Sequence, residues 1–246
     1  MSFTGIEFKH NSGNAFEINF NTPKTIDLLA LQGDEFDFLL DEQAISSGTY
    51  NWMRLKVMAQ QNSLDSYIEL DTGTQHALYI PSGSETGLKL NQSFTIPSTG
   101  NLDLTIDFDL RKPVIAPQSG TSYILKPSLR LLQTDLTGHI SGTVDGTVLQ
   151  GANCSGTDYA VYAYQGTDIV PDDVDGINSD PITTSQVKLN NQGLYGYTLG
   201  FLNEGSYTVT FTCDAGSDNP DSNDMLNYIG TRNVTVLAGQ TAIHNF

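Results

Sequence analysis

The chain has 246 residues, of which 38% are hydrophobic, and 11 basic against 28 acidic side chains give it a formal net charge of −17. This charge repels both the phosphate backbone of nucleic acids and anionic membrane surfaces, so neither is an expected partner. No segment reaches the length of apolar sequence that spans a bilayer, and the chain is long enough for two domains of ordinary size.

The first half of the chain alternates apolar and polar residues, which is typical of β-strands, and has almost no helical periodicity. Turn signals rich in Gly, Pro, Asn and Asp separate the strands. The stretch 25–46 lacks the alternation, and we expect one or two short helical turns there. The predicted strands are Ser2–Lys9, Ala15–Asn21, Thr49–Met58, Ser66–Leu70, His76–Ile80, Gly87–Ile96, Asn101–Leu110 and Ser122–Leu132.

One strand of this half contains the single Trp of the chain. Regular alternation places Tyr50, Trp52 and Arg54 on one face. Such a face can simply be solvated, and if Asn101–Leu110 is a neighbouring strand, its aspartates would pair with Arg54 and Lys56. An exposed Trp beside a Tyr can also hold a sugar ring or a partner protein. Tyr50, Trp52 and Arg54 are therefore a candidate ligand platform.

The second half contains seven short strands separated by turns, a pattern typical of a small antiparallel sandwich. We therefore predict an all-β chain of two antiparallel β-sandwich domains in tandem, residues 1–135 and 136–246. The strands predicted in the second domain are Thr137–Val144, Asp158–Gln165, Pro181–Leu189, Leu194–Phe201, Ser206–Cys213, Ile229–Leu237 and Thr241–Phe246.

The only two cysteines, Cys154 and Cys213, both lie at strand edges of the second domain. An even number of cysteines so placed predicts one disulfide and hence an extracytoplasmic compartment: cell surface, outer membrane, periplasm or secreted. No signal peptide is visible at the N-terminus, so we expect the chain to be truncated there. The alternative is a cytosolic protein with two free thiols.

Two loops of the second domain, 171–180 and 214–224, are rich in Asp and Asn. Calcium takes six to eight oxygen ligands, which such loops can supply, although neither loop has the EF-hand spacing. Asp218, Asp221 and Asp224 recur at every third residue and are the candidate calcium ligands. The alternative is a solvated acidic loop without an ion.

The second domain resembles the carboxypeptidase-regulatory or transthyretin-like (prealbumin-like) sandwich. The similarity is carried by a turn that leads into a strand with the pattern Leu-x-x-Gly-x-Tyr, which lies within Leu202–Val209. Three shorter matching segments precede it: Gly142-Thr143-Val144, Tyr162-Ala163-Tyr164 and Gly196-Tyr197.

Residues 1 to about 133 resemble the bacterial family called domain of unknown function 4382, which occurs in exported lipoproteins. The segments that carry this similarity are Phe3–Glu7, Ile26–Leu31, Ile45–Tyr50 followed by Trp52–Val57, and Leu129–Leu131. The resemblance implies a preceding lipoprotein signal and one additional strand. Anchoring to a membrane would then depend on that lipid signal. The family brings no established activity.

No enzymatic constellation is apparent. The four histidines have no metal-ligand spacing, and the segment Gly138–Gly142 lacks the spacing of a G-x-S-x-G nucleophile elbow. We therefore expect a non-catalytic, exported protein of the bacterial cell surface with a structural or adhesive role, and no metal or cofactor needed for catalysis. The alternative is a glycan-binding accessory module, stabilised by calcium.

Overall fold

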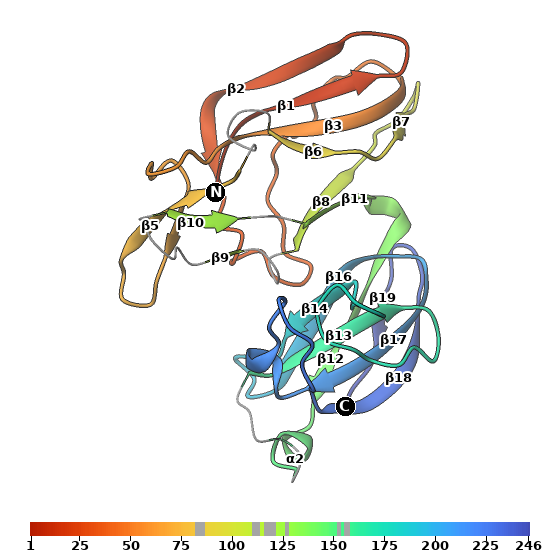
Figure 1. The fold of residues 1–246 in the computed structure, drawn as a ribbon. Helices are drawn as coiled ribbons and strands as arrows, with labels where there is room; N and C mark the ends of the chain where they lie inside the picture. The colour runs from red at the N-terminus through yellow and green to blue at the C-terminus, as the bar shows by residue number, and fades with distance from the viewer. Residues whose placement is uncertain (82–86, 110–113, 116–121, 126–127, 152–153, 155–157) are drawn as a thin grey trace. The chain divides into compact units, whose positions relative to one another are not determined.

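The computed structural model describes residues 1–246 except 82–86, 110–113, 116–121, 126–127, 152–153 and 155–157. Its elements are nearly all strands, which confirms the predicted all-β fold (Figure 1). The chain divides into two compact units. Unit 1 comprises Met1–Ala30 and Asp37–Leu131, and unit 2 comprises Leu31–Phe36 and Leu132–Phe246. The predicted domains are 1–135 and 136–246. The two units instead divide between Leu131 and Leu132, and a short segment from the first half of the chain belongs to unit 2.

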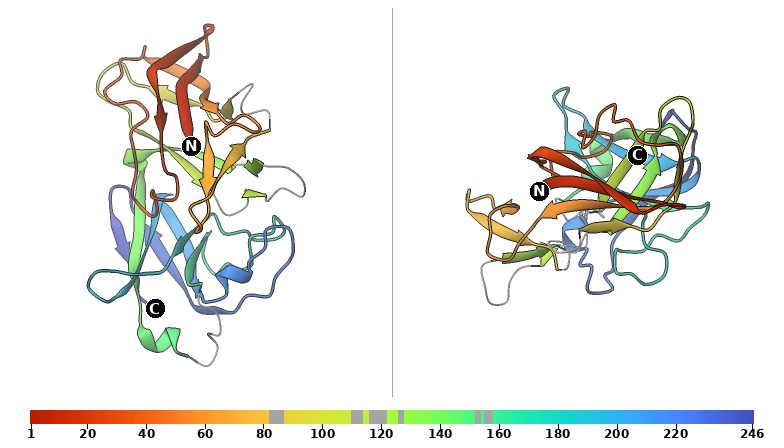
Figure 2. Two further views of the ribbon diagram at one scale, coloured as in Figure 1. Left: turned by 90° about the vertical axis from the view of Figure 1, so that its left-hand side faces the viewer. Right: turned by 90° about the horizontal axis from the view of Figure 1, so that it is seen from above.

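The largest sheet of unit 1 has the strand order β2-β1-β3-β6, and a fifth strand, β7, also pairs with β3. All of these pairs are antiparallel. β1, β2 and β3 lie side by side in both views of Figure 2. The bounds of the strands are β1 Ser2–His10, β2 Ala15–Thr25, β3 Gly48–Met58, β6 Leu88–Leu90 and β7 Phe94–Ile96.

Two smaller sheets complete unit 1. One has the order β4-β5-β10-β9 and contains a parallel pair between β5 and β10, whereas the other joins β8 and β11. The bounds are β4 Tyr67–Glu69, β5 Gln75–Tyr79, β8 Leu104–Asp109, β9 Val114–Ile115, β10 Ser122–Leu125 and β11 Ser128–Gln133.

The inner face of the large sheet of unit 1 buries a row of apolar side chains from each central strand, as the alternation in the sequence requires. An aromatic group lies at one end of this row, where Phe8, Tyr50 and Phe94 pack with ring centroids 5.3–6.5 Å apart. The buried residues on β1, β3 and β6 include Phe3, Ile6, Phe8, Tyr50, Met53, Leu55, Val57, Leu88 and Leu90.

Unit 2 is a sandwich of two four-stranded sheets, ordered β15-β16-β12-β19 and β14-β13-β17-β18. The pairs are antiparallel except for β12 and β19, which are parallel. The bounds are β12 Thr137–Val144, β13 Ala160–Gln165, β14 Thr183–Gln186, β15 Lys188–Leu189, β16 Tyr195–Asn203, β17 Gly205–Thr212, β18 Tyr228–Val236 and β19 Thr241–Ile243. Short helical turns lie at Thr134–Leu136 (η1), Gly146–Leu149 (α2) and Ala215–Ser217 (η2).

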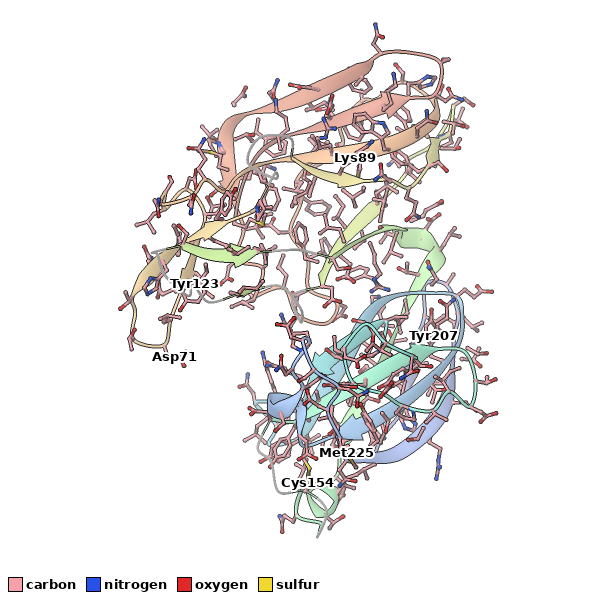
Figure 3. The ribbon with its side chains drawn as sticks, viewed as in Figure 1. Asp71, Lys89, Tyr123, Cys154, Tyr207 and Met225 are labelled. Carbon is pink, nitrogen blue, oxygen red and sulfur yellow. A yellow bond between two sulfur atoms is a disulfide. The ribbon has the colours of Figure 1, made fainter. Side chains whose placement is uncertain are left out.

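One apolar core fills the space between the two sheets of unit 2. Cys213 is part of this core and is fully buried, and it forms the predicted disulfide with Cys154, with Cα atoms 5.5 Å apart (Cys154 is labelled in Figure 3). The bond closes a loop across 59 residues of sequence. It therefore ties the chain ahead of β13 to the end of β17.

Several predicted elements differ in detail. The stretch from residue 26 to 47 contains turns and no helix, because its polar residues and Gly33 favour turns over helical hydrogen bonding. The predicted strand Gly87–Ile96 is divided into β6 and β7, and Pro181–Leu189 into β14 and β15, which belong to different sheets. Among the described residues, no helix is long and apolar enough to cross a membrane.

Candidate functional site

The outer face of the sheet β14-β13-β17-β18 is covered by the two acidic loops. Ala160, Tyr162 and Tyr164 of β13 form a second apolar cluster on this face together with Val174, which comes from the first loop. The residues of β13 from Ala160 to Tyr164 are consequently all buried, although a strand in a two-layer sandwich ordinarily exposes alternate residues. The loops thus form a third layer over the sheet.

Two tyrosine hydroxyls of β13 hold the loops on the sheet. Tyr164 Oη donates a hydrogen bond of 2.5 Å to the backbone oxygen of Asp172, and Tyr162 Oη donates one to a carboxylate oxygen of Asp218. Burial raises the pKa of Tyr164 well above its ordinary value, so this hydroxyl stays protonated and remains a donor. Each loop is therefore anchored by its own tyrosine.

Asp173 lies at the centre of the acidic cluster and is fully buried, with 0% of its surface exposed. Its Oδ2 accepts a hydrogen bond of 2.6 Å from the backbone N–H of Asp224. Its Oδ1 is also buried and has no hydrogen-bond partner among the described residues. Burial raises the pKa of Asp173 above 3.8, the hydrogen bond from Asp224 opposes this, and the negative charges of Asp175 and Asp172 add to it.

Other carboxylates converge on Asp173. Carboxylate oxygens of Asp173, Asp218 and Asp224 lie within 4.8 Å of one another, and Asp172, Asp173 and Asp175 form a second group of this kind. Asp218 Oδ1 accepts a hydrogen bond of 3.1 Å from the backbone of the first loop. The two acidic loops are therefore one structure with Asp173 common to both groups.

The predicted calcium ligands are only partly brought together. Asp218 and Asp224 belong to the cluster, whereas Asp221 is exposed and outside it, with its backbone N–H bonded to Asn219. The sequence analysis missed Asp173. No local pattern could have indicated it, because the first loop folds back across β13 to meet a loop that follows β17.

The predicted ligand platform does not form, because Tyr50 is on the opposite face of β3 from Trp52. Lys9 pairs with Trp52 and His10 pairs with Tyr50, so Asn51 is an extra residue with no partner on β1. Such a β-bulge reverses the alternation. Tyr50 is thus directed inward, has 0% exposure and donates a hydrogen bond of 2.8 Å to a backbone oxygen.

Trp52 lies on the outer face of β3 and is partly buried. Its ring contacts two cations, with the Arg54 guanidinium 4.9 Å and the Lys89 ammonium 4.7 Å from the ring centroid. Lys89 is exposed on β6 and is labelled in Figure 3. Instead of the predicted Tyr50 and Trp52 platform, this face therefore presents the Trp52 indole between two basic side chains.

The outer face of this sheet is rich in basic residues for so acidic a chain. We define it as the cationic face, formed by Lys9, Trp52, Arg54, Lys56 and Lys89. Two glutamates offset part of its charge, since Arg54 pairs with one on β1 at 2.6 Å and Lys56 pairs with one on β2 at 2.6 Å. The face therefore carries four of the 11 basic residues of the chain.

Pairing of Arg54 and Lys56 with the aspartates of Asn101–Leu110 is expected only if the two strands are neighbours. Among the described strands, β3 pairs with β1, β6 and β7, whereas β8 pairs with β11, so this condition is not met. Asp107 instead bonds to Arg130 of β11, whose Nε lies 2.9 Å from its carboxylate. Strand order, which the sequence pattern does not specify, decides which charges meet.

Comparison with solved structures gives three similar chains. The Bacillus anthracis TIE protein has 9% sequence identity and a TM-score of 0.26. The match covers 100% of the present chain and 30% of the TIE protein. A Bacteroides fragilis protein described as a candidate cell adhesion protein has 10% identity and a TM-score of 0.25, covering 99% of this chain and 79% of its own. GBS52, the minor pilin of Streptococcus agalactiae, has 11% identity and a TM-score of 0.23, covering 100% of this chain and 82% of its own. TM-scores of this size do not establish a shared fold.

Sequence comparison is more informative for unit 1. No curated protein matches the chain. The profile of the family described as a domain of unknown function (DUF4382) matches residues 1–127, which is more than half of the chain. The match ends before residues 136–246, so the resemblance of that part of the chain to transthyretin-like domains stays a prediction. The chain belongs to the family described as a domain of unknown function, DUF4382.

Proposed function

We propose that this protein is an extracytoplasmic, non-catalytic protein of the bacterial cell surface, with a structural or adhesive role. The observation that carries the proposal is the disulfide between Cys154 and Cys213, because disulfides persist in oxidising compartments and are rare in the cytosol. The resemblance of unit 1 to a family of exported lipoproteins supports the cell surface in particular.

The surroundings of the four histidines support a non-catalytic role. Each packs against a different aromatic ring: His10 against Tyr50, His76 against Tyr123, His139 against Phe201 and His244 against Phe246. Histidines that act in general acid–base catalysis or bind a metal lie within reach of other polar groups of one site. Four separate packing positions favour a structural role for these side chains.

The location is tested on protein taken from its own cells. Whole cells are treated with a thiol-alkylating reagent that blocks disulfide exchange, and the chain is isolated without reductant and analysed by mass spectrometry. We expect neither cysteine to be alkylated, whereas a sample reduced first should carry the label on both. Two alkylated cysteines in the unreduced sample would contradict an extracytoplasmic location. Proteolysis of intact cells should additionally cleave the protein if it faces the medium.

A second candidate function is binding of an anionic glycan at the cationic face. The supporting observation is that Lys89 is exposed beside the partly buried indole of Trp52, while the chain as a whole is strongly acidic. An indole supplies a flat surface for a sugar ring, and the ammonium group supplies a charge for its carboxylates. This differs from the platform predicted from the sequence, since Tyr50 takes no part.

Affinity electrophoresis in gels containing alginate, an anionic polysaccharide, tests this candidate against gels containing neutral dextran. Alginate should retard the wild type at low salt, and Lys89→Ala and Trp52→Ala should abolish the retardation. Lys188→Ala is the matched control, because Lys188 is exposed on β15 of unit 2. Equal mobility of the wild type in both gels, or an equal effect of Lys188→Ala, would exclude binding at the cationic face.

A further inference from the structure

We propose that Asp173, Asp218 and Asp224 bind a calcium ion that joins the two acidic loops of unit 2. This inference goes beyond the proposed function and does not depend on it. It also replaces the ligand set predicted from the sequence, because Asp173 takes the place of Asp221.

The spacing of the carboxylates fits a calcium ion. Oxygen ligands lie about 2.3–2.6 Å from calcium, so two ligands on opposite sides of the ion are separated by roughly twice that distance. Oxygens of Asp173, Asp218 and Asp224 all lie within 4.8 Å of one another. The three carboxylates can therefore contact one ion together.

Asp173 provides the observation that points to a ligand. Its side chain is fully buried, and its Oδ1 has no hydrogen-bond partner among the described residues. A buried polar atom without a partner is costly, and native structures nearly always satisfy it. A cation within reach of Asp218 and Asp224 would satisfy this oxygen.

The hydrogen bonds within the cluster position the ligands without occupying them fully. Asp224 accepts a bond of 2.7 Å from the backbone N–H of Asn219, and Asp218 accepts one of 3.1 Å from the backbone N–H of Val174. A carboxylate oxygen has two lone pairs, so it can accept a hydrogen bond and still coordinate a metal. Such bonds fix the orientation of ligands around an ion.

The charge of the cluster favours a divalent cation. Asp172 and Asp175 stand beside Asp173, which brings five carboxylates into the region, and none of the described ion pairs joins them to Lys or Arg. Negative charges this close repel one another unless a cation neutralises them. The cluster thus offers a strongly negative site in a fold anchored by two tyrosines.

The ligand type indicates calcium rather than a transition metal. Both groups of carboxylates consist of oxygen ligands alone, without His or Cys, and hard cations prefer such ligands. Calcium accepts irregular sets of six to eight oxygens, whereas magnesium demands a near-octahedral arrangement. Ligands from two separate loops, completed by water, suit the more tolerant ion.

The test uses the full chain after removal of metal with EDTA and dialysis. Calcium chloride is titrated in by calorimetry, and thermal unfolding is followed with and without the ion. We expect saturable binding with a Kd of about 10⁻⁴–10⁻³ M or tighter, the range of extracellular calcium modules, and a rise of the unfolding midpoint. Magnesium chloride at equal concentration should give a smaller rise.

Variants locate the binding. Asp173→Asn and Asp218→Asn should each weaken calcium binding at least tenfold, whereas Asp221→Asn should bind as the wild type does, because Asp221 is exposed and outside the cluster. Circular dichroism establishes that each variant is folded. If Asp173→Asn fails to fold, Asp218→Asn and Asp224→Asn decide the result.

Three outcomes would overturn the inference: no heat and no change of midpoint in about 10 mM calcium, equal loss of binding in Asp221→Asn, or tighter binding of magnesium than of calcium. None of these outcomes bears on the cellular location, which the alkylation experiment tests separately. Likewise, a cytosolic location would leave the calcium measurement unaffected.

Discussion

The backbone N–H of Asp224 donates a hydrogen bond of 2.6 Å to Oδ2 of Asp173, although 51 residues separate the two in the sequence. The bond joins the loop that follows β13 to the loop that follows β17. Because Asp173 is fully buried, its protonation state affects the stability of the whole layer that covers the outer face of the sheet.

Asp173→Asn should raise the unfolding midpoint of the calcium-free protein at neutral pH. The amide removes a buried negative charge from a group of carboxylates and keeps an oxygen that can accept the hydrogen bond from Asp224. Thermal unfolding in EDTA measures the effect, with Asp221→Asn as the control that leaves the midpoint within about 1 °C. A lower midpoint for Asp173→Asn would contradict the conclusion that the buried negative charge of Asp173 destabilises the calcium-free protein.

The pH dependence of the stability of the wild type and of Asp173→Asn gives a second prediction. The folded-state pKa of Asp173 is raised above 3.8, so the folded protein binds the proton more tightly than the unfolded chain does. The stability that this group contributes is therefore fully present below pH 3.8 and is lost as the pH rises through the raised pKa. In EDTA, the wild type should lose stability relative to Asp173→Asn over this window. Urea unfolding at several pH values measures it, and a constant difference would contradict it.

Gly200→Ala should displace the segment Leu31–Phe36 from unit 2. A Cβ atom at Gly200 would lie 2.0 Å from the backbone oxygen of Gly33, which leaves no room for a methyl group. We expect a loss of about 1–3 kcal/mol in the free energy of unfolding, together with faster proteolysis of the segment.

Gly196→Ala is the matched control on the same strand, β16. Its Cβ would have its nearest contacts at 3.8 Å, an ordinary van der Waals distance. Proteolysis and stability should stay close to those of the wild type. Equal behaviour of the two variants would mean that the segment does not pack against Gly200 in solution.

Reduction of the disulfide should destabilise unit 2 and not unit 1. The bond closes a loop across 59 residues, and loop-closure entropy predicts a loss of about 4 kcal/mol in the free energy of unfolding. Trp52 is the only Trp and lies in unit 1, so its fluorescence reports unit 1, whereas tyrosine circular dichroism includes unit 2. With reductant present, the tyrosine signal should change at a lower urea concentration than it does without reductant. A parallel shift of the Trp52 transition would instead indicate that the units unfold together.

Tyr50→Ala should cost much more stability than Trp52→Ala. Tyr50 is fully buried among aromatic rings, and such truncations cost about 3–5 kcal/mol. Trp52 is partly exposed on the outer face, so its loss should cost less. Urea unfolding followed by circular dichroism compares the two. Equal losses of stability in the two variants would contradict the placement of Tyr50 and Trp52 on opposite faces of β3.

The sequence could predict most of the strands and the disulfide, because both follow from local chemistry. Alternation along β3 and β13 marks strands without reference to any partner, and two cysteines at strand edges leave one possible intramolecular pairing. The all-β class follows from the same signals, and the predicted division at residue 135 lies within a few residues of the boundary at Leu132.

Tertiary structure alone decided which of these residues meet. The extra residue Asn51 moved Tyr50 into the core, since a bulge depends on the pairing with β1 and not on the alternation of β3 itself. Asp173 reached Asp218 and Asp224 because the first loop folds back over β13, where two tyrosines bind the loops. The acidic composition of both loops was evident from the sequence. Their joining around one buried carboxylate depends on contacts between residues far apart in the chain, which no local pattern records.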